Sequence, residues 1–298
     1  PRTMDMKRRS FLASCAAGAG AMAAMSSTAI AATKESKPFA NLPLKIAAPY
    51  SWFDGTPAER LAQAAAWGLP AVEWLGPDKS AEELRDASEK TGVKWTCIGG
   101  VGAIAPGQMV QPKEHDKLVE NFRERVAFGK SIGVTTFVGL TGNARDDISY
   151  DRHMTYVVQC LRRLAPIAEE NGVTIVMESL NTLVDHHGYF LSRTDQAMLI
   201  LEAVNSPNVK MLFDIYHQQI MEGNVIRNLG ENIERIGHIH VGDNPGRKQP
   251  GTGELNYPNI FKSIASTNYQ GYVALECGYT TATGDEALAQ VADCFNWT

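Results

Sequence analysis

The chain has 298 residues, of which 44% are hydrophobic and 20% are charged, and its formal net charge is −5. This composition supplies enough apolar material for a sizeable core, and an α/β barrel of this length can form a single domain. The first 31 residues carry a charge of +3, so the remainder carries −8. Such an acidic surface disfavours binding to nucleic-acid phosphates.

The first predicted element is a signal peptide over residues 1–31. Residues 7–13 read KRRSFLA, a twin arginine followed by Phe-Leu, and an uncharged Ala-rich run then extends to a small-residue AIA motif at 29–31. This pattern predicts recognition by the twin-arginine export machinery and a periplasmic location. The uncharged run is long enough to cross a bilayer, but it is only weakly apolar, so we expect no stable membrane span in the mature form.

A polar linker is expected over residues 32–43, and short apolar runs then alternate with longer amphipathic stretches. The apolar runs have the composition of strands buried on both faces. They cover residues 45–50, 71–75, 94–99, 135–140, 174–179, 209–214, 237–241 and 272–276. Helices are expected at 57–67, 80–92, 113–132, 150–170, 194–204, 225–235, 257–267 and 284–295.

Eight strand–helix units predict the α/β class and one (β/α)₈ barrel over residues 44–298. The competing doubly wound sheet needs a glycine-rich phosphate loop after its first strand, and PYSWFDGTP is not such a loop. Four cysteines follow the predicted signal in no zinc-like spacing, and the sequence leaves open whether any of them pair.

Four consecutive predicted strands end in side chains that bind metals. They are Glu178 in VMES, Asp214 in LFDIYH, His240 in GHIHV and Glu276 in ALECG. Because active sites of such barrels lie at the C-terminal ends of the strands, we expect the four to converge. Grouped carboxylates repel one another without a cation, and this set suits one divalent ion, Mn²⁺, Mg²⁺ or Co²⁺. Any one residue alone could instead be a helix N-cap or a loop ion pair.

Several long phrases resemble the hydroxypyruvate isomerase branch of the xylose-isomerase-like sugar isomerase/epimerase barrels. They are MESLNT, GYFLSRTDQA, SPNVKMLFDIYHQQIMEGN and IGHIHVGDNPGRKQPGTGELNYPNIF, and the resemblance runs from about Lys45 to Gly278. It implies a metal-dependent isomerase of the same barrel fold. Hydroxypyruvate isomerases usually carry Gln where this chain has His240, whereas sugar epimerases carry His.

The resemblance also assigns roles to individual residues. It implies that Glu178 and Glu276 bind the metal and carry the proton chemistry. Asp214 and His240 would complete the metal shell. His217 in DIYH and Arg247 in NPGR match positions that face the substrate.

Further candidates for the substrate pocket come from strand ends and loops. Tyr50 and Trp52, after the first strand, are candidates for an apolar wall, with core packing as the alternative. Glu73, in the second strand, is either a hydrogen-bond acceptor for substrate or part of a buried structural pair. His186 and His187 lie in the loop after the fifth strand, where a pocket position competes with simple solvent exposure.

These residue types fit the movement of a carbonyl between adjacent carbons of a small hydroxy-keto acid or sugar. A cation stabilises an ene-diolate, and Glu178 and Glu276 form the acid/base pair. Alternatives with the same metal site are a keto-sugar epimerase and a lyase or dehydratase. An endonuclease IV-type phosphodiesterase and a non-catalytic exported sugar-binding protein are further alternatives, the former disfavoured by the acidic chain. The oligomeric state stays open, a homo-oligomer included.

Overall fold

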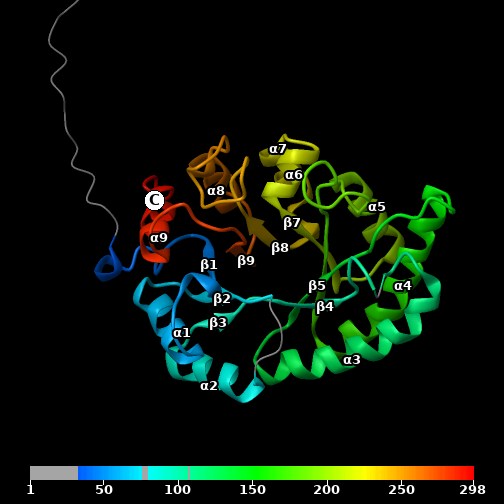
Figure 1. The fold of residues 1–298 in the computed structure, drawn as a ribbon, viewed down its shortest axis with the longest axis horizontal. Coiled ribbons are helices and arrows are strands. Elements are labelled where there is room, and N and C mark those ends of the chain that lie inside the picture. The colour runs from blue at the N-terminus through cyan, green and yellow to red at the C-terminus, as the bar shows by residue number, and fades with distance from the viewer. Residues whose placement is uncertain (1–32, 76–79, 107) are drawn as a thin grey trace, which may run out of the picture. The chain divides into compact units, whose positions relative to one another are not determined.

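Parallel strands form the centre of the molecule in a computed structural model, which describes residues 33–75, 80–106 and 108–298. The strand order is β3-β2-β1-β9-β8-β7-β6-β5-β4, and the paired strands run parallel. The two ends of this order, β3 (Lys94–Trp95) and β4 (Ile98–Val101), are separated in the chain only by Thr96 and Cys97. The result is an α/β fold of TIM-barrel type (Figure 1).

The strands match the predicted runs closely. The other strands are β1 (Lys45–Pro49), β2 (Ala71–Glu73), β5 (Thr136–Gly139), β6 (Thr174–Glu178), β7 (Val209–Asp214), β8 (Ile236–Val241) and β9 (Tyr272–Leu275). The predicted strand at 94–99 is divided into β3 and β4. Each strand is largely buried, because helices cover its outer side and inward-facing side chains of the other strands cover its inner side.

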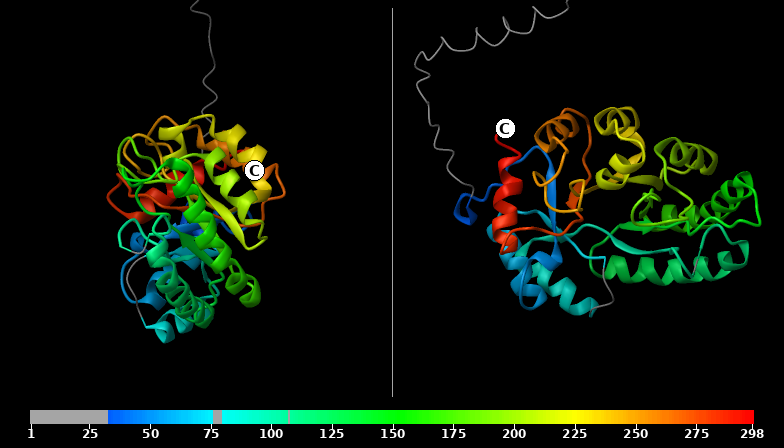
Figure 2. Two further views of the ribbon diagram at one scale, coloured as in Figure 1. Left: turned by 90° about the vertical axis from the view of Figure 1, so that its right-hand side faces the viewer. Right: turned by 45° about the horizontal axis from the view of Figure 1, so that its top comes forward.

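Helices connect the strands and lie outside them (Figures 1 and 2). They are α1 (Pro57–Ala66), α2 (Ala81–Thr91), α3 (His115–Ser131), α4 (Tyr150–Asn171), α5 (Thr194–Val204), α6 (Ile215–Met221), α7 (Val225–Asn232), α8 (Tyr257–Ala265) and α9 (Gly284–Asp293). Helix α6 was not predicted from the sequence. Short 3₁₀ helices occupy Lys34–Ser36, Tyr50–Trp52, Pro112–Glu114 and Ile233–Arg235.

The inner side of the sheet carries a small apolar layer beneath the strand ends. Cys97, Val138, Val176 and Leu212 form one buried cluster in it, and Ala47, Ala71 and Ala274 form another. Alternate residues of a strand share a face. The predicted ligands Glu178, Asp214 and Glu276 lie two positions beyond Val176, Leu212 and Ala274, respectively. They are therefore also directed inward.

The predicted signal peptide, residues 1–31, lies outside the described residues. Among the described residues, no helix has both the length and the apolar character needed to cross a membrane.

Candidate metal centre and active site

The four predicted ligands lie together at the C-terminal ends of neighbouring strands. Glu178 ends β6, Asp214 ends β7, His240 lies in β8 and Glu276 directly follows β9. One ligand atom from each lies within 4.8 Å of the ligand atoms of the others. Strand register produces this convergence, because Asp214 is paired with His240 between β7 and β8.

His240 stands at the middle of the group. Its Nδ1 atom lies 3.0 Å from Oε2 of Glu276 and 3.6 Å from Oε1 of Glu178. The imidazole is fully buried, and Nδ1 makes no hydrogen bond to the described residues. Buried polar atoms normally have a hydrogen-bond partner. A buried nitrogen that lacks one and is surrounded by three carboxylates therefore fits a ligand of a cation. The donor set of three carboxylates and an imidazole suits Mn²⁺, Mg²⁺ or Co²⁺.

Arg247 reaches the same carboxylates from the loop between β8 and α8. Its Nη2 atom lies 3.1 Å from Oδ2 of Asp214 and 2.5 Å from Oε2 of Glu276. Its guanidinium carbon also lies 5.1 Å from the centre of the Tyr216 ring. These contacts hold a planar cation beside the acids, where it can bind a substrate oxygen or carboxylate.

The carboxylates have different proton affinities. Burial raises the pKa of Glu178 to about 7, and the charges of Glu276 and Asp214 add to this rise. Burial would also raise the pKa of Asp214, but His217 and Arg247 outweigh it and hold this pKa at about 2. At neutral pH, Asp214 is therefore ionised, while Glu178 can either hold or accept a proton, as proton transfer requires.

His217 lies next to the four ligands, and its hydrogen bonds define its tautomer. The backbone N–H of Asn181 donates to Nδ1 of His217 at 3.2 Å, so Nδ1 carries the lone pair and Nε2 carries the proton. Burial lowers the pKa of His217, which favours the neutral ring. The buried Nε2 atom lies 3.6 Å from Oδ2 of Asp214 and makes no hydrogen bond to the described residues. It is a free donor directed into the site.

The two histidines of the loop after β6 have different surroundings. His187 is exposed, and its Nδ1 lies 2.8 Å from the backbone oxygen of Thr182. His186 is half-buried, and its ring lies 5.3 Å from that of His217. Of the two histidines, His186 therefore lies closer to the acids than His187, which was predicted as a substrate contact.

The two aromatic residues after β1 are both buried but have different surroundings. Trp52 is buried, and its indole N–H donates to the backbone oxygen of Cys277 at 3.0 Å. Tyr50 is also buried but lines a pocket of about 420 Å³ that includes Trp74, Leu75 and Glu276. Trp74, which directly follows Glu73 in AVEWL, was not predicted as a pocket residue from the sequence.

A second residue missed from the sequence is Asp243, which organises the loop that carries Arg247. Its buried carboxylate accepts four backbone N–H groups, at 2.8 to 3.2 Å. These belong to Asn244, Gly251, Gly253 and Leu255. The signal lay in VGDNPG, where an aspartate precedes an Asn-Pro-Gly turn.

Glu73 lies on the opposite side of His240 from the other acids. Its Oε1 is 2.7 Å from Nε2 of His240, and its Oε2 is 2.8 Å from Nε2 of His238. The Glu73 side chain is only 3% exposed. The structure therefore gives this carboxylate protein partners, which is the structural alternative to a substrate contact.

Comparison with known proteins identifies relatives along most of the chain. It is 33% identical over 234 residues to the 2-oxo-tetronate isomerase of Cupriavidus necator, covering 77% of this chain and 89% of the relative. It is 29% identical over 233 residues to the hydroxypyruvate isomerase of Escherichia coli, covering 76% and 89%. These relatives identify the chain as an enzyme of the isomerase/epimerase class.

Solved structures and family comparison agree on the fold. An AP endonuclease, family 2, from Brucella melitensis superposes with a TM-score of 0.74 at 24% identity, covering 84% of this chain and 98% of that one. At this identity the likeness shows the fold alone. The family described as xylose isomerase-like TIM barrel matches residues 61–296. The chain therefore belongs to the xylose isomerase-like TIM barrel family.

Proposed function

We propose that this protein is a divalent-metal-dependent isomerase that moves a carbonyl between adjacent carbons of a small hydroxy-keto acid or sugar. The observation that carries the proposal is the convergence of Glu178, Asp214, His240 and Glu276 within 4.8 Å. The names of the two curated relatives, a hydroxypyruvate isomerase and a 2-oxo-tetronate isomerase, point to short hydroxy-keto acids as substrates.

The four ligands would hold one divalent ion, which when bound would polarise the carbonyl and stabilise negative charge on its oxygen. The protein supplies the remaining chemistry. One of Glu178 and Glu276 removes the proton from the carbon that bears the hydroxyl, which gives an ene-diolate. The other returns a proton to the former carbonyl carbon, and the hydroxyl proton passes between the two oxygens. A pKa of about 7 suits Glu178 to either role at neutral pH.

Two donors can orient the substrate during this exchange. The neutral His217 presents its Nε2–H beside Asp214, where it can donate to a substrate oxygen. Arg247 can receive a carboxylate or hydroxyl group through the donors not used by Asp214 and Glu276. Both would fix the carbon to be deprotonated between the two glutamates.

Exchange of hydrogen with solvent tests the proposal. The mature protein, loaded with Mn²⁺, is incubated in D₂O with hydroxypyruvate, 2-oxo-tetronate and a panel of ketoses, and products are followed by NMR. We expect an isomeric product with deuterium on the newly protonated carbon. Loss of water or bond cleavage would assign the site to a lyase or dehydratase. Substrate that binds without any exchange would identify a non-catalytic sugar-binding protein.

A keto-sugar epimerase is the second candidate, and two observations favour it. This chain has His240 at a position where sugar epimerases carry His and hydroxypyruvate isomerases usually carry Gln. The pocket of about 420 Å³ beside Glu276 also has aromatic lining from Tyr50 and Trp74, which suits the apolar face of a sugar ring. In the same experiment, deuterium at a carbon of inverted configuration, with the carbonyl unmoved, would select the epimerase.

We also propose that the protein is exported through the twin-arginine pathway. The support is the KRRSFLA phrase and the small-residue motif at 29–31. In a bacterial host with this pathway, the full chain is expected in the periplasm. Replacing both Arg8 and Arg9 with Lys should retain it in the cytoplasm, and unchanged fractionation would contradict the proposal.

A further inference from the structure

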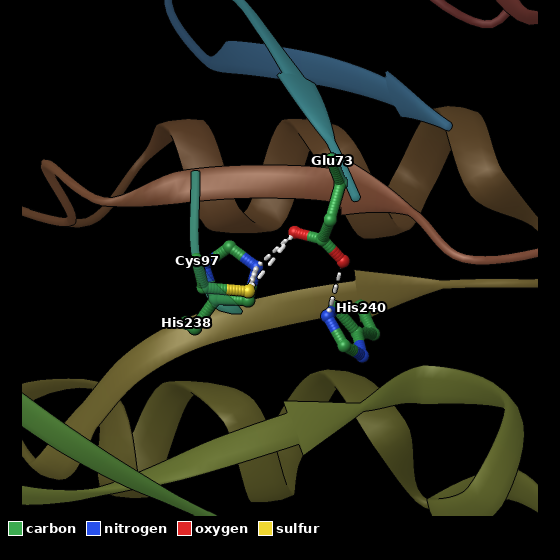
Figure 3. A group of neighbouring side chains, drawn as sticks. All are labelled: Glu73, Cys97, His238 and His240. Carbon is green, nitrogen blue, oxygen red and sulfur yellow. Dashed lines mark hydrogen bonds and ion pairs between the residues drawn. The ribbon is translucent and has the colours of Figure 1, made fainter. Parts of the chain in front are cut away.

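A second buried cluster lies directly behind the proposed metal ligands. It contains Glu73, Cys97, His238 and His240, so His240 belongs to both groups (Figure 3). Figure 3 shows the Glu73 carboxylate placed between the two imidazoles, with one oxygen directed to each. The corresponding distances are 2.7 Å to His240 and 2.8 Å to His238.

The oxygen that faces His238 is well supplied with donors. The hydroxyl of Thr96 donates to Oε2 of Glu73 at 2.6 Å, and the thiol of Cys97 donates to it at 3.4 Å. Burial and the neighbouring Glu73 charge raise the pKa of Cys97, so the thiol keeps its proton. The other oxygen, Oε1, faces Nε2 of His240.

These four side chains do not form a second metal site. Zinc bonds of roughly 2.0–2.3 Å place tetrahedral ligands more than about 3 Å apart. The contacts of 2.7 and 2.8 Å between Glu73 and the imidazoles are instead the distances of hydrogen-bonded or ion-paired groups. A protonated Cys97 is also a poor zinc ligand, because the thiolate is the form that binds.

The contact between Glu73 and His240 is electrostatic. The atoms lie 2.7 Å apart, but the imidazole N–H is not aligned for a full hydrogen bond. The carboxylate nevertheless favours the proton on Nε2, because the Coulomb attraction between buried groups at this distance is strong. A proton on Nε2 leaves the Nδ1 lone pair toward Glu178 and Glu276, which are 3.6 and 3.0 Å away.

We propose that Glu73 is a positioning residue, which holds His240 in the Nε2–H tautomer and thereby presents Nδ1 as a metal ligand. The inference rests on the proposed metal site. A carboxylate behind a ligating histidine fixes the ring and strengthens the ligand, and its loss typically weakens metal binding by about 10–100-fold. Thr96 and His238 hold the far oxygen of Glu73, so the carboxylate cannot turn away from His240 without losing both contacts.

Glu73→Gln tests this role, because the amide has the same size and lacks the charge. Mn²⁺ binding is measured by calorimetry on folded, metal-free protein. We expect a Kd for Mn²⁺ that is weaker by about 10–100-fold. The matched control is Thr96→Val, which removes a hydrogen bond from the other oxygen of Glu73 and should change the Kd less than about threefold. Equal affinities of the wild type and Glu73→Gln would overturn the inference, as would equal losses in Glu73→Gln and Thr96→Val.

A second measurement needs no substitution at Glu73. In wild-type protein with ¹⁵N-labelled histidine and bound Mg²⁺, the nitrogen shifts of His240 should show a proton on Nε2 and none on Nδ1. A proton on Nδ1 would overturn the inference even if the variant does not fold. The two proposals fail differently. If the wild type binds no divalent ion, both the metal site and the role of Glu73 are wrong. If it binds one with His240 in the other tautomer, only the role of Glu73 is wrong.

Discussion

Asp214 accepts a hydrogen bond from the backbone N–H of His217 at 3.1 Å, and this bond joins the end of β7 to the start of α6. The bond uses Oδ1, while Oδ2 faces Arg247 at 3.1 Å. One side chain therefore caps a helix with one oxygen and contributes to the proposed metal site with the other. The same turn brings the imidazole of His217 back toward the site, because three residues of helix complete almost one turn.

Substitution of Asp214 should separate these two tasks. Asn is as good an N-cap as Asp, so Asp214→Asn should keep α6 but lose a charged ligand, weakening Mn²⁺ binding more than about 100-fold. Asp214→Ala should lose the cap as well and cost a further 0.5–2 kcal/mol or so of stability. Calorimetry gives the Kd, and urea unfolding of metal-free protein gives the stability. Tight Mn²⁺ binding by Asp214→Asn would show that Asp214 is only a cap.

The two glutamates of the proposed acid/base pair should be needed for turnover beyond any effect on metal binding. At saturating Mn²⁺, Glu178→Gln and Glu276→Gln should each lower kcat by about 10²–10⁴-fold, the usual contribution of a proton-transfer group. Glu202→Gln, an exposed position on α5, is the matched control and should retain full activity. Either site variant with near-wild-type kcat and metal bound would show that its glutamate transfers no proton.

Metal affinity should rise with pH. The pKa of Glu178 is raised to about 7, mainly by burial, so a proton must leave before this carboxylate can bind a cation. Below pH 7 the apparent Mn²⁺ affinity should fall roughly tenfold per pH unit for each proton that the metal displaces. Above pH 7 Glu178 is already ionised and adds no further pH dependence. Burial lowers the pKa of His240, but the charges of Glu73 and Glu276 outweigh it and raise this pKa. Loss of a proton from His240 therefore makes the pH dependence of metal affinity steeper.

Calorimetric titration with Mn²⁺ between pH 5.5 and 8, on the wild type and Glu178→Gln, checks this. We expect the slope of log Kd against pH below 7 to be shallower in the variant by about one proton. An affinity that is constant or increases as pH falls would contradict the assignment of Glu178 as a ligand.

The carboxylate of Asp243 should support both stability and the position of Arg247. Asp243→Asn replaces one acceptor oxygen by an amide, so the N–H groups of Gly251 and Gly253 lose their partner. Both glycines are exposed, so water can replace the lost acceptor, and loss of the two hydrogen bonds should cost about 1–3 kcal/mol. KM should rise as well, because the loop holds Arg247. Asp86→Asn, an exposed control on α2, should change the free energy of unfolding by less than about 0.5 kcal/mol. Unchanged stability and KM in Asp243→Asn would contradict this role.

Much of the fold and of the ligand set followed from local patterns. The strands were visible because they are buried on both faces. The grouping of Glu178, Asp214, His240 and Glu276 was visible because each was expected at the end of one of four consecutive strands. The helix α6 was missed, since its seven residues directly continue β7 and give no separate amphipathic period. The partners of Glu73 could not be read from the sequence, because His238 and His240 are 165 and 167 positions away and lie on β8, a strand that does not pair with β2.

Other side chains were placed in ways that spacing alone does not determine. Trp52 follows a strand end, as a pocket residue would, yet its indole N–H is bound to the backbone of Cys277. His186 and His187 are adjacent and chemically identical, and only the path of the loop decides that His186 lies beside His217. Loop conformation also depends on hydrogen bonds that spacing does not reveal, such as the four that Asp243 accepts from backbone N–H groups of its own loop.

Anomalous X-ray diffraction from crystals of the protein soaked in Mn²⁺ would locate the proposed metal ion. We expect one strong peak, bounded by the carboxylates of Glu178, Asp214 and Glu276 and by Nδ1 of His240. No peak at these four side chains, or a peak bound instead by Cys97 and His238, would contradict the proposed site.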